Sequence, residues 1–190
     1  MSKTRILVSG ANGQLGQELQ VLAQQHPHAE WYFFDREGLD ISSAQAVRQI
    51  FDAVQPQYCI NAAAYTAVDA AETDAANAFL INAESMVWLA DCCATYQSCL
   101  FYISTDYVYH GDQNRPYRES DAPAPKNVYA RSKFQGEETA LRANPQTYVL
   151  RTSWLYSSFG RNFVKTMLRL GQERDQLGIV RDQIGSPTYA

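Results

Sequence analysis

Short apolar runs alternate with longer amphipathic segments along the chain, and this alternation limits the fold more than any other feature. Runs at 5–9, 30–34, 58–62, 100–104 and 147–152 predict buried strands, with a further short strand at 178–180. Helical spacing of apolar residues predicts helices over 14–25, 42–55, 73–96, 127–142 and 162–170. Because parallel strands need crossovers of this length and continuous apolar runs suit a sheet covered on both sides, we expect a doubly wound parallel α/β sheet with helices on both faces.

Composition excludes several classes of protein. The 190 residues carry a formal net charge of -4, which argues against a nucleic-acid binder, since such proteins present a basic surface. No stretch approaches 18 consecutive apolar residues, and the first residues lead directly into a strand, so neither a membrane span nor a signal peptide is expected. We therefore expect a cytoplasmic protein without nucleic-acid or membrane partners. The four cysteines lack zinc-type spacing, so neither a metal site nor a disulfide is predicted.

A glycine-rich turn joins the first predicted strand to the first predicted helix. The glycines of this turn follow the spacing G-x-x-G-x-x-G from Gly10 to Gly16. Glycine allows a sharp turn and a close approach of the backbone to a diphosphate, and the following helix offers free N–H groups to the anion. The predicted diphosphate-binding residues of this turn are Gly10, Asn12, Gly13, Gln14, Leu15 and Gly16.

Two further strand ends suit a dinucleotide. Asp35 follows the second strand, 19 positions after Gly16, where a carboxylate can accept hydrogen bonds from the adenosine ribose. This favours NADH, but the adjacent Arg36 could pair with a 2′-phosphate, so NADPH stays open. The small residues Ala62, Ala63 and Ala64 at the end of the third strand would let a cofactor pass close by.

A catalytic group is predicted on the helix over 127–142. Tyr129 and Lys133 are four residues apart and therefore share one helical face. A neighbouring ammonium favours the phenolate and lowers the pKa of a tyrosine, which could then exchange a proton with a developing alkoxide. Ser104 and Thr105 end the fourth strand, and either hydroxyl could contact the substrate carbonyl or Tyr129. A solvated helix face is the alternative interpretation of the Tyr/Lys spacing.

Together these motifs resemble the extended short-chain dehydrogenases/reductases, whose fold is of the Rossmann type, over essentially the whole chain. The resemblance is carried by GANGQLG, NAAAYTAVD, STDYVYHG, NVYARSKFQGE, RTSWLY and DQIGSPTYA. It implies a catalytic set of Thr105, Tyr129 and Lys133. It implies cofactor contacts, beyond the glycine turn and the alanines, by Asp35, Asp40, Ile41, Ala64, Tyr65, Thr66, Tyr129 and Lys133. It implies substrate contacts by Thr105, Asp106 and Trp154.

Within this family the resemblance is strongest to enzymes that reduce a dTDP-bound 4-keto-6-deoxysugar. It implies that NADH or NADPH reduces the C4 keto group of dTDP-4-dehydro-L-rhamnose, a step toward cell-surface polysaccharide. The sequence reads Thr105-Asp106-Tyr107 where related dehydratases have Thr-Asp-Glu, which disfavours dehydration. Another epimerase or reductase of the family, and a non-catalytic cofactor-binding subunit, stay open, although the Tyr/Lys pair argues against the latter.

The length of the chain bears on its domains and partners. Members of this family are longer, so we expect an N-terminal portion with a cofactor domain at 1–155 and the start of a substrate-binding part at 156–190. We expect weak or absent turnover from these 190 residues alone. The resemblance also implies a homodimer, and it places any Mg²⁺ ligands beyond residue 190, so no metal is assigned to this chain.

Overall fold

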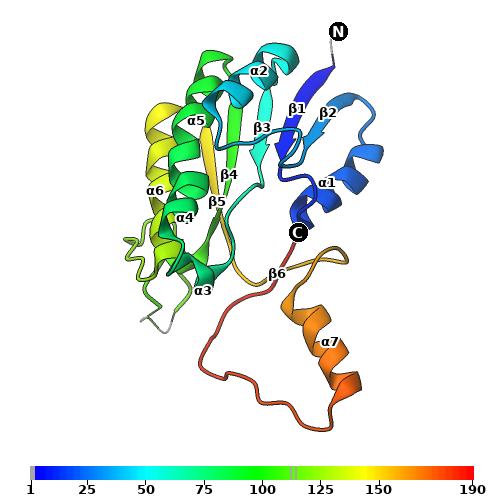
Figure 1. Ribbon diagram of the computed structural model, residues 1–190, viewed down its shortest axis with the longest axis vertical. Helices are drawn as coiled ribbons and strands as arrows, with labels where there is room; N and C mark the ends of the chain where they lie inside the picture. Colours follow the sequence, from blue (N-terminus) through cyan, green and yellow to red (C-terminus); the bar gives the residue numbers. More distant parts are fainter. Residues whose placement is uncertain (1–2, 112, 114) are drawn as a thin grey trace.

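Five parallel strands form the central sheet of the computed structural model (Figure 1), which describes residues 3–111, 113 and 115–190. Their order across the sheet is β2-β1-β3-β4-β5. Their bounds are β1 Thr4–Ser9, β2 Ala29–Phe34, β3 Tyr58–Asn61, β4 Cys99–Thr105 and β5 Thr147–Thr152. The five strands predicted from the longer apolar runs are confirmed, and so is the parallel α/β fold.

The helices are unevenly distributed over the two faces of this sheet. The helical elements are α1 Gln14–Gln24, α2 Ala44–Val54, α3 Val68–Ala71, α4 Ala75–Phe79, the π-helical turn η1 Leu80–Glu84, α5 Ser85–Thr95, the 3-10 turn η2 Asp106–Val108, α6 Val128–Ala143 and α7 Phe163–Glu173. One face is covered by α2, α5 and α6, whereas α1 lies on the other face beside β2, and α7 lies beyond the carboxyl ends of the strands (Figure 1).

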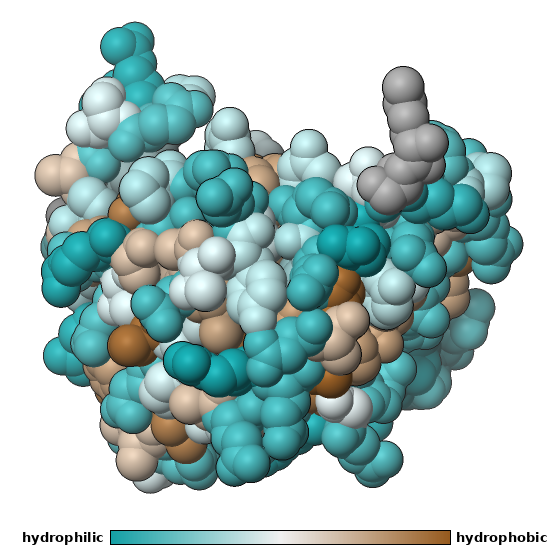
Figure 2. Space-filling model, turned by 90° about the horizontal axis from the view of Figure 1, so that it is seen from above, coloured by the Kyte–Doolittle hydropathy of each residue, from teal (hydrophilic) through white to brown (hydrophobic). Residues whose placement is uncertain are grey.

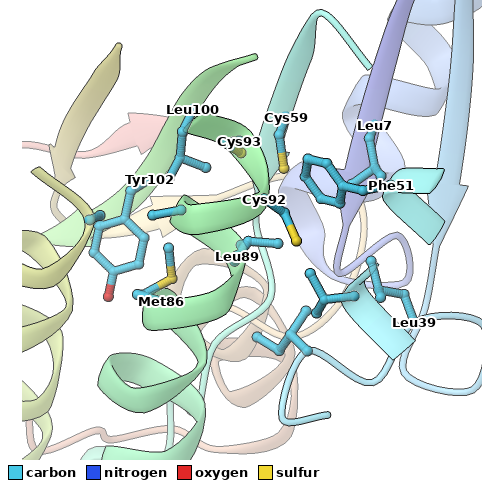
Figure 3. Close-up of a cluster of buried hydrophobic side chains, with 14 residues drawn as sticks. Leu7, Leu39, Phe51, Cys59, Met86, Leu89, Cys92, Cys93, Leu100 and Tyr102 are labelled. Atoms are coloured by element: carbon cyan, nitrogen blue, oxygen red, sulfur yellow. The ribbon is translucent and has the colours of Figure 1, made fainter. Parts of the chain in front are cut away.

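The main core lies between the sheet and the α2–α5–α6 layer (Figure 3). Side chains that point from the strands toward α5, such as Leu7, Cys59 and Leu100, are fully buried. Met86 and Leu89 of α5 meet them from the helical layer. Burial of this apolar surface is the main force that holds α5 against the sheet.

The opposite face of β3, β4 and β5 carries a row of aromatic rings. Phe101 stacks on Tyr148 with ring centroids 5.5 Å apart, and Tyr58 lies 6.3 Å from Phe101 on the other side. Tyr58, Tyr148 and Leu150 are exposed there. This part of the sheet is therefore apolar on both faces but covered on one.

Two predictions about secondary structure need correction. The helix predicted over 73–96 is divided into α4, η1 and α5, and the π-helical turn places the buried Asn82 toward α6. The strand predicted over 178–180 is absent, and Ile179 and Val180 are exposed. A second parallel pair forms instead between β6 Leu155–Tyr156 and β7 Thr188–Tyr189, because a short apolar run becomes a strand only where a partner strand is available.

The surface at the end of the molecule where β1 begins is mostly hydrophilic, with hydrophobic side chains scattered among polar ones (Figure 2). Among the described residues, no helix combines the length and the apolar character needed to cross a bilayer.

Candidate functional site

A cavity of about 940 Å³ opens at the carboxyl ends of the strands. The order of the strands reverses here, because β2 lies on one side of β1 and β3 lies on the other. Ligands usually bind at such a point in an open α/β sheet. The predicted residues that line the cavity are Gly10, Asn12, Gly13, Gln14, Leu15, Gly16, Asp35, Asp40, Ile41, Ala62, Ala63, Ala64, Thr66, Thr105, Asp106, Tyr129, Lys133 and Trp154. Its size lies in the range of small-molecule and cofactor sites.

Two glycines of the turn between β1 and α1 have no room for a side chain. Gly10 has φ +75°, and a Cβ there would lie 2.6 Å from the backbone nitrogen of Ala63. A Cβ on Gly16 would lie 2.4 Å from the carbonyl oxygen of Gly10. Gly13 caps α1 without a side-chain hydrogen bond, and the first turn carries no acidic residue. The start of α1 therefore presents backbone N–H groups and the positive end of its dipole to the cavity.

Asp35 has a structural role in the turn after β2 as well as a place in the cavity. Its Oδ2 accepts a hydrogen bond from Asn12 Nδ2 at 3.0 Å, and its Oδ1 accepts one from the Gly38 nitrogen at 3.0 Å. Arg36 lines the same part of the cavity. The carboxylate thus joins the glycine turn to the end of β2.

Asp40 and Ile41 complete this wall. The carboxylate of Asp40 accepts hydrogen bonds from the backbone nitrogen and the hydroxyl of Ser42, and these bonds lower its pKa. Ile41 is buried, and its carbonyl accepts a 2.6 Å hydrogen bond from Trp88 Nε1 of α5. Asp40 is therefore held by its own turn, and Ile41 is held by a contact with α5.

Tyr65 lies differently from the other residues of the predicted cofactor stretch. In the described structure its side chain does not line the cavity but packs on the apolar cluster of Ala71, Ala78 and Val128. Its backbone nitrogen and oxygen pair with the side chain of Asn82 at 2.9 and 3.0 Å.

Tyr129 and Lys133 both face the cavity from α6, as their spacing predicts. Lys133 is buried, its Nζ donates a 2.6 Å hydrogen bond to the Ile103 carbonyl, and burial lowers its pKa to about 7. Burial raises the pKa of Tyr129, while a side-chain hydrogen bond with Thr105 acts in the opposite direction. The expected lowering of the tyrosine pKa by Lys133 is therefore not what this structure shows, because burial of the phenol dominates.

The two hydroxyls at the end of β4 have different partners. Thr105 is the one that reaches Tyr129, and its Oγ1 also lies 3.2 Å from Asp106 Oδ1. The Ser104 hydroxyl instead donates a 2.5 Å hydrogen bond to Glu137. Burial raises the pKa of the Asp106 carboxyl. Of the two candidates, the structure brings Thr105 to the tyrosine.

Trp154 lies where the main cavity meets a second one of about 450 Å³. Its backbone has φ 48°, a left-handed conformation that is unusual for a bulky residue. Its ring contacts Phe163 of α7 edge-on, with centroids 5.3 Å apart. Asp106 and Tyr107 also line both cavities.

Several residues of the site have no signal in the local sequence. Asn82 of η1 holds the backbone of Tyr65 and also donates a 3.0 Å hydrogen bond to Ser132 of α6. Gly160 and Arg161 line the cavity from the loop before α7. Ser153 follows directly after β5 and lines the cavity. Its place at the carboxyl end of a predicted strand could have identified it as a site residue. Among the described residues, no three metal-ligating side chains cluster together.

Comparison with known proteins agrees with this geometry. Residues 4–190 match the model of the RmlD substrate binding domain. The chain is 43% identical over 186 residues to a dTDP-4-dehydrorhamnose reductase of Aggregatibacter actinomycetemcomitans, covering 98% of this chain and 63% of that protein. It is 40% identical to the spore coat polysaccharide biosynthesis protein SpsK of Bacillus subtilis, covering 98% of this chain and 65% of that protein.

A solved structure is similar over almost the whole chain. The crystal structure of a dTDP-4-dehydrorhamnose reductase of Bacillus anthracis in complex with NADP superposes with a TM-score of 0.95 at 44% identity, covering 99% of this chain and 66% of that one. The chain thus spans less than two thirds of the length of these relatives. The match to the family model over residues 4–190 and the 43% identity over 186 residues lead to one conclusion: the chain belongs to the RmlD substrate-binding-domain family.

Proposed function

We propose that this chain carries the cofactor-binding and catalytic part of a dTDP-4-dehydrorhamnose reductase. The reaction is the reduction by NADH or NADPH of the C4 keto group of dTDP-4-dehydro-L-rhamnose, which gives dTDP-L-rhamnose. The observation that supports it most is that one cavity joins the glycine turn to Thr105, Tyr129 and Lys133. Three relatives of this name are 43%, 40% and 44% identical to the chain, and the last of them is in complex with NADP in its crystal structure.

The residues of the cavity fit a dinucleotide. The backbone at Gly10 and Gly16 leaves no space for a Cβ, and the uncapped start of α1 suits a diphosphate. Ala62, Ala63, Ala64 and Thr66 would line the path of the cofactor, and Asp35, Asp40 and Ile41 would hold its adenosine end. When bound, the cofactor supplies the hydride.

Both cofactors are compatible with the end of β2. Each oxygen of the Asp35 carboxylate already accepts a hydrogen bond within the protein, so part of its capacity to accept from a ribose is used by the turn. Arg36 lines the same wall and offers a guanidinium to that phosphate. We therefore propose that the enzyme accepts NADPH as well as NADH.

Tyr129 would donate the proton to the substrate oxygen. Its raised pKa keeps the phenol protonated at neutral pH, so a proton is available when negative charge develops on that oxygen. Thr105 would orient the phenol, and Lys133 would hold the ribose next to the nicotinamide. Asp106 and Trp154, at the junction of the two cavities, would contact the sugar nucleotide.

Replacement of the phenol tests this assignment. In the full-length protein, Tyr129→Phe should lower kcat for reduction of dTDP-4-dehydro-L-rhamnose by on the order of 100-fold or more, because general-acid catalysis contributes about that much. NADPH affinity, measured by fluorescence titration, should change little. The matched control is Tyr148→Phe, on the exposed face of β5, which should leave both quantities unchanged.

Other results would redirect the proposal. Turnover at the wild-type rate in Tyr129→Phe would remove Tyr129 from the role of acid. Binding of NADPH without reduction of any dTDP-4-keto-6-deoxysugar would favour a non-catalytic subunit. Formation of a product with an inverted configuration at a sugar carbon would favour an epimerase.

A division into a cofactor domain at 1–155 and the start of a substrate part at 156–190 is supported by the end of the main sheet at Thr152 and the separate β6–β7 pair. A homodimer and a cytoplasmic location stay predictions, which gel filtration and fractionation of cells would test.

A further inference from the structure

Glu137 of α6 is a buried carboxylate behind the reaction site. Only 1% of its surface is exposed, and it lies one helical turn after Lys133 and two turns after Tyr129. These three residues therefore share one face of α6. Burial of a carboxylate is costly unless the charge is paired and hydrogen-bonded, so the partners of Glu137 indicate why it is there.

The partners of Glu137 come from the two strands beside α6. Ser104 of β4 donates a hydrogen bond to Oε1 at 2.5 Å. Arg151 of β5 donates from Nε to Oε1 at 3.0 Å and from Nη2 to Oε2 at 2.5 Å, which is a two-pronged ion pair. Since Ser104 directly precedes Thr105, the carboxylate fixes the strand end that carries the hydroxyl beside Tyr129.

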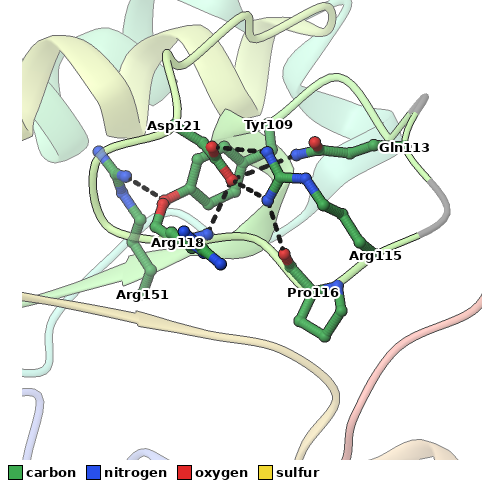
Figure 4. Close-up of polar contacts among 7 residues, drawn as sticks. All are labelled: Tyr109, Gln113, Arg115, Pro116, Arg118, Asp121 and Arg151. Carbon is green, nitrogen blue, oxygen red and sulfur yellow. Dashed lines mark hydrogen bonds and ion pairs between the residues drawn. The ribbon is translucent and has the colours of Figure 1, made fainter.

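Arg151 extends this contact to the loop between β4 and α6. Its Nη1 donates a 2.5 Å hydrogen bond to the hydroxyl of Tyr109, and its guanidinium lies 4.9 Å from the centre of that ring (Figure 4). Tyr109 stacks on Tyr117 with centroids 4.2 Å apart. Asp121 holds the same loop by an ion pair with Arg115 (Figure 4). The loop that begins at Asp106 is thus anchored to Glu137 through Arg151.

Glu137 also acts on the charge of Lys133. Burial lowers the pKa of Lys133, and the negative charge of Glu137 acts in the opposite direction. The Lys133 ammonium donates to the carbonyl of Ile103, the residue before Ser104, and lies 4.1 Å above the ring of Tyr102. The carboxylate therefore favours the protonated form of Lys133, and its hydrogen bond with Ser104 fixes the strand next to the carbonyl to which Lys133 donates.

Other charged groups near α6 are placed differently. Asp106 of η2 faces the cavity, and Glu72, after α3, accepts a hydrogen bond from the Val128 nitrogen at the start of α6. Asp69 of α3, Glu84 of η1 and Asp91 of α5 are exposed.

We propose that Glu137 is a positioning residue for the reduction, which holds Ser104 and Arg151 so that Thr105, Lys133 and the loop from Asp106 keep their places around the reacting group. This inference rests on the proposed function. Glu137 touches neither cofactor nor substrate in it and acts through its neighbours.

The test is Glu137→Gln in the full-length protein, with the exposed neighbour Glu138→Gln as matched control. Loss of the charge should lower kcat/KM for the keto-sugar by on the order of 100-fold, as expected for a displacement of about 1 Å at a reaction site. It should also move the alkaline limb of the pH profile of kcat/KM to lower pH, because Lys133 then loses its proton more easily. The pH dependence of NADPH affinity, followed by fluorescence, should shift in the same direction. Glu138→Gln should leave both profiles in place.

A second variant separates positioning from stability. Glu137→Gln leaves the guanidinium of Arg151 without the carboxylate that balances its charge, so the protein is destabilised. The double variant Glu137→Gln/Arg151→Met removes both charges and should regain stability against urea, yet it should keep the shifted pH profile. Glu137→Asp retains the charge and should keep the alkaline limb near its wild-type position.

The outcomes distinguish this inference from the function on which it rests. An alkaline limb that stays in place in Glu137→Gln, with a loss of activity that the double variant restores, would show that Glu137 serves stability alone. Absence of keto-sugar turnover in the wild type and in Glu138→Gln would instead overturn the proposed function.

Discussion

Helices α6 and α7 begin in the same way but have opposite surroundings. Asn127 caps α6 by accepting a hydrogen bond from the Ala130 nitrogen at 2.7 Å, and Asn162 caps α7 by accepting one from the Lys165 nitrogen at 3.0 Å. Seven residues of α6 are buried, Lys133 among them, whereas α7 buries none. Capping therefore sets where each helix begins and says nothing about how it packs.

The two helices also differ in how well their amphipathic pattern matches the burial of their side chains. α7 has a clear apolar side, yet Phe163, Val164 and Leu168 are exposed. α6 has charged residues on its buried side, because the neighbouring strands supply a partner for each charge. Partners from other elements, rather than the pattern along the helix, decide which side chains are buried.

The largest difference between the two helices is expected when one glycine of each helix is replaced by alanine. In Gly136→Ala the new Cβ would lie 2.1 Å from the Asn82 carbonyl oxygen and 2.4 Å from the Tyr102 hydroxyl, so we expect a loss of about 3 kcal/mol or more in the free energy of unfolding. In Gly171→Ala of α7 the Cβ meets nothing within 4 Å, and a gain of up to about 1 kcal/mol is expected. Urea denaturation measures both. Equal losses in the two variants would contradict the difference in packing.

The second effect concerns the buried cation of α6. The pKa of Lys133 is lowered to about 7 in the folded state from 10.5, so unfolding takes up a proton between these values and stability rises with pH across this window. The wild type should therefore gain about 2 kcal/mol relative to Lys133→Met between pH 7 and pH 9. Urea denaturation at the two pH values measures this difference, and a difference that does not change with pH would contradict it. Lys165→Met, at an exposed position of α7, should change stability by less than about 0.5 kcal/mol at either pH.

Replacement of the two capping residues should affect different parts of the protein: the whole fold for α6, and the helix alone for α7. Asn127→Ala should lower the global free energy of unfolding by about 1 kcal/mol, because α6 belongs to the core. Asn162→Ala also loses hydrogen bonds to Gln14 and Ser157. It should mainly speed amide hydrogen exchange within α7, since none of the residues of that helix is buried. A global loss of stability as large as that of Asn127→Ala would mean that α7 unfolds together with the core.

The smallest effect is expected where both helices are exposed. Leu141 of α6 and Leu168 of α7 are 52% and 66% exposed. Leu141→Ser and Leu168→Ser should each change the free energy of unfolding, measured by urea denaturation, by less than about 0.5 kcal/mol. A larger loss at Leu168 alone would show that the apolar side of α7 packs against something in solution.

The parts of the site that depend on local geometry could be predicted from the sequence. Gly10 and Gly16 are required by the turn itself, and the four-residue spacing of Tyr129 and Lys133 sets their common face. Parallel strands place Asp35 at the same edge of the sheet.

Properties that arise between distant elements could not be predicted. The side chain of Tyr65 turns to an apolar cluster that forms only when α3, α4 and α6 meet. The pKa of Tyr129 depends on how deeply α6 is buried, which the helical spacing does not contain. The pair Glu137–Arg151 joins a helix to a strand, and the local sequence offers no reason to match them.

The order of the strands has a consequence for synthesis of the chain. β1 is flanked by β2 and β3, so the turn at Gly10 and the backbone of Ala62 and Ala63 come together from the first third of the sequence. The hydroxyl and the helix that face them come later, and β5 is made roughly 5 to 20 seconds after β3 at the usual speed of translation. The two walls of the cavity are therefore made in succession, and on the ribosome the wall with the glycine turn can assemble before the wall with Tyr129 and Lys133 exists.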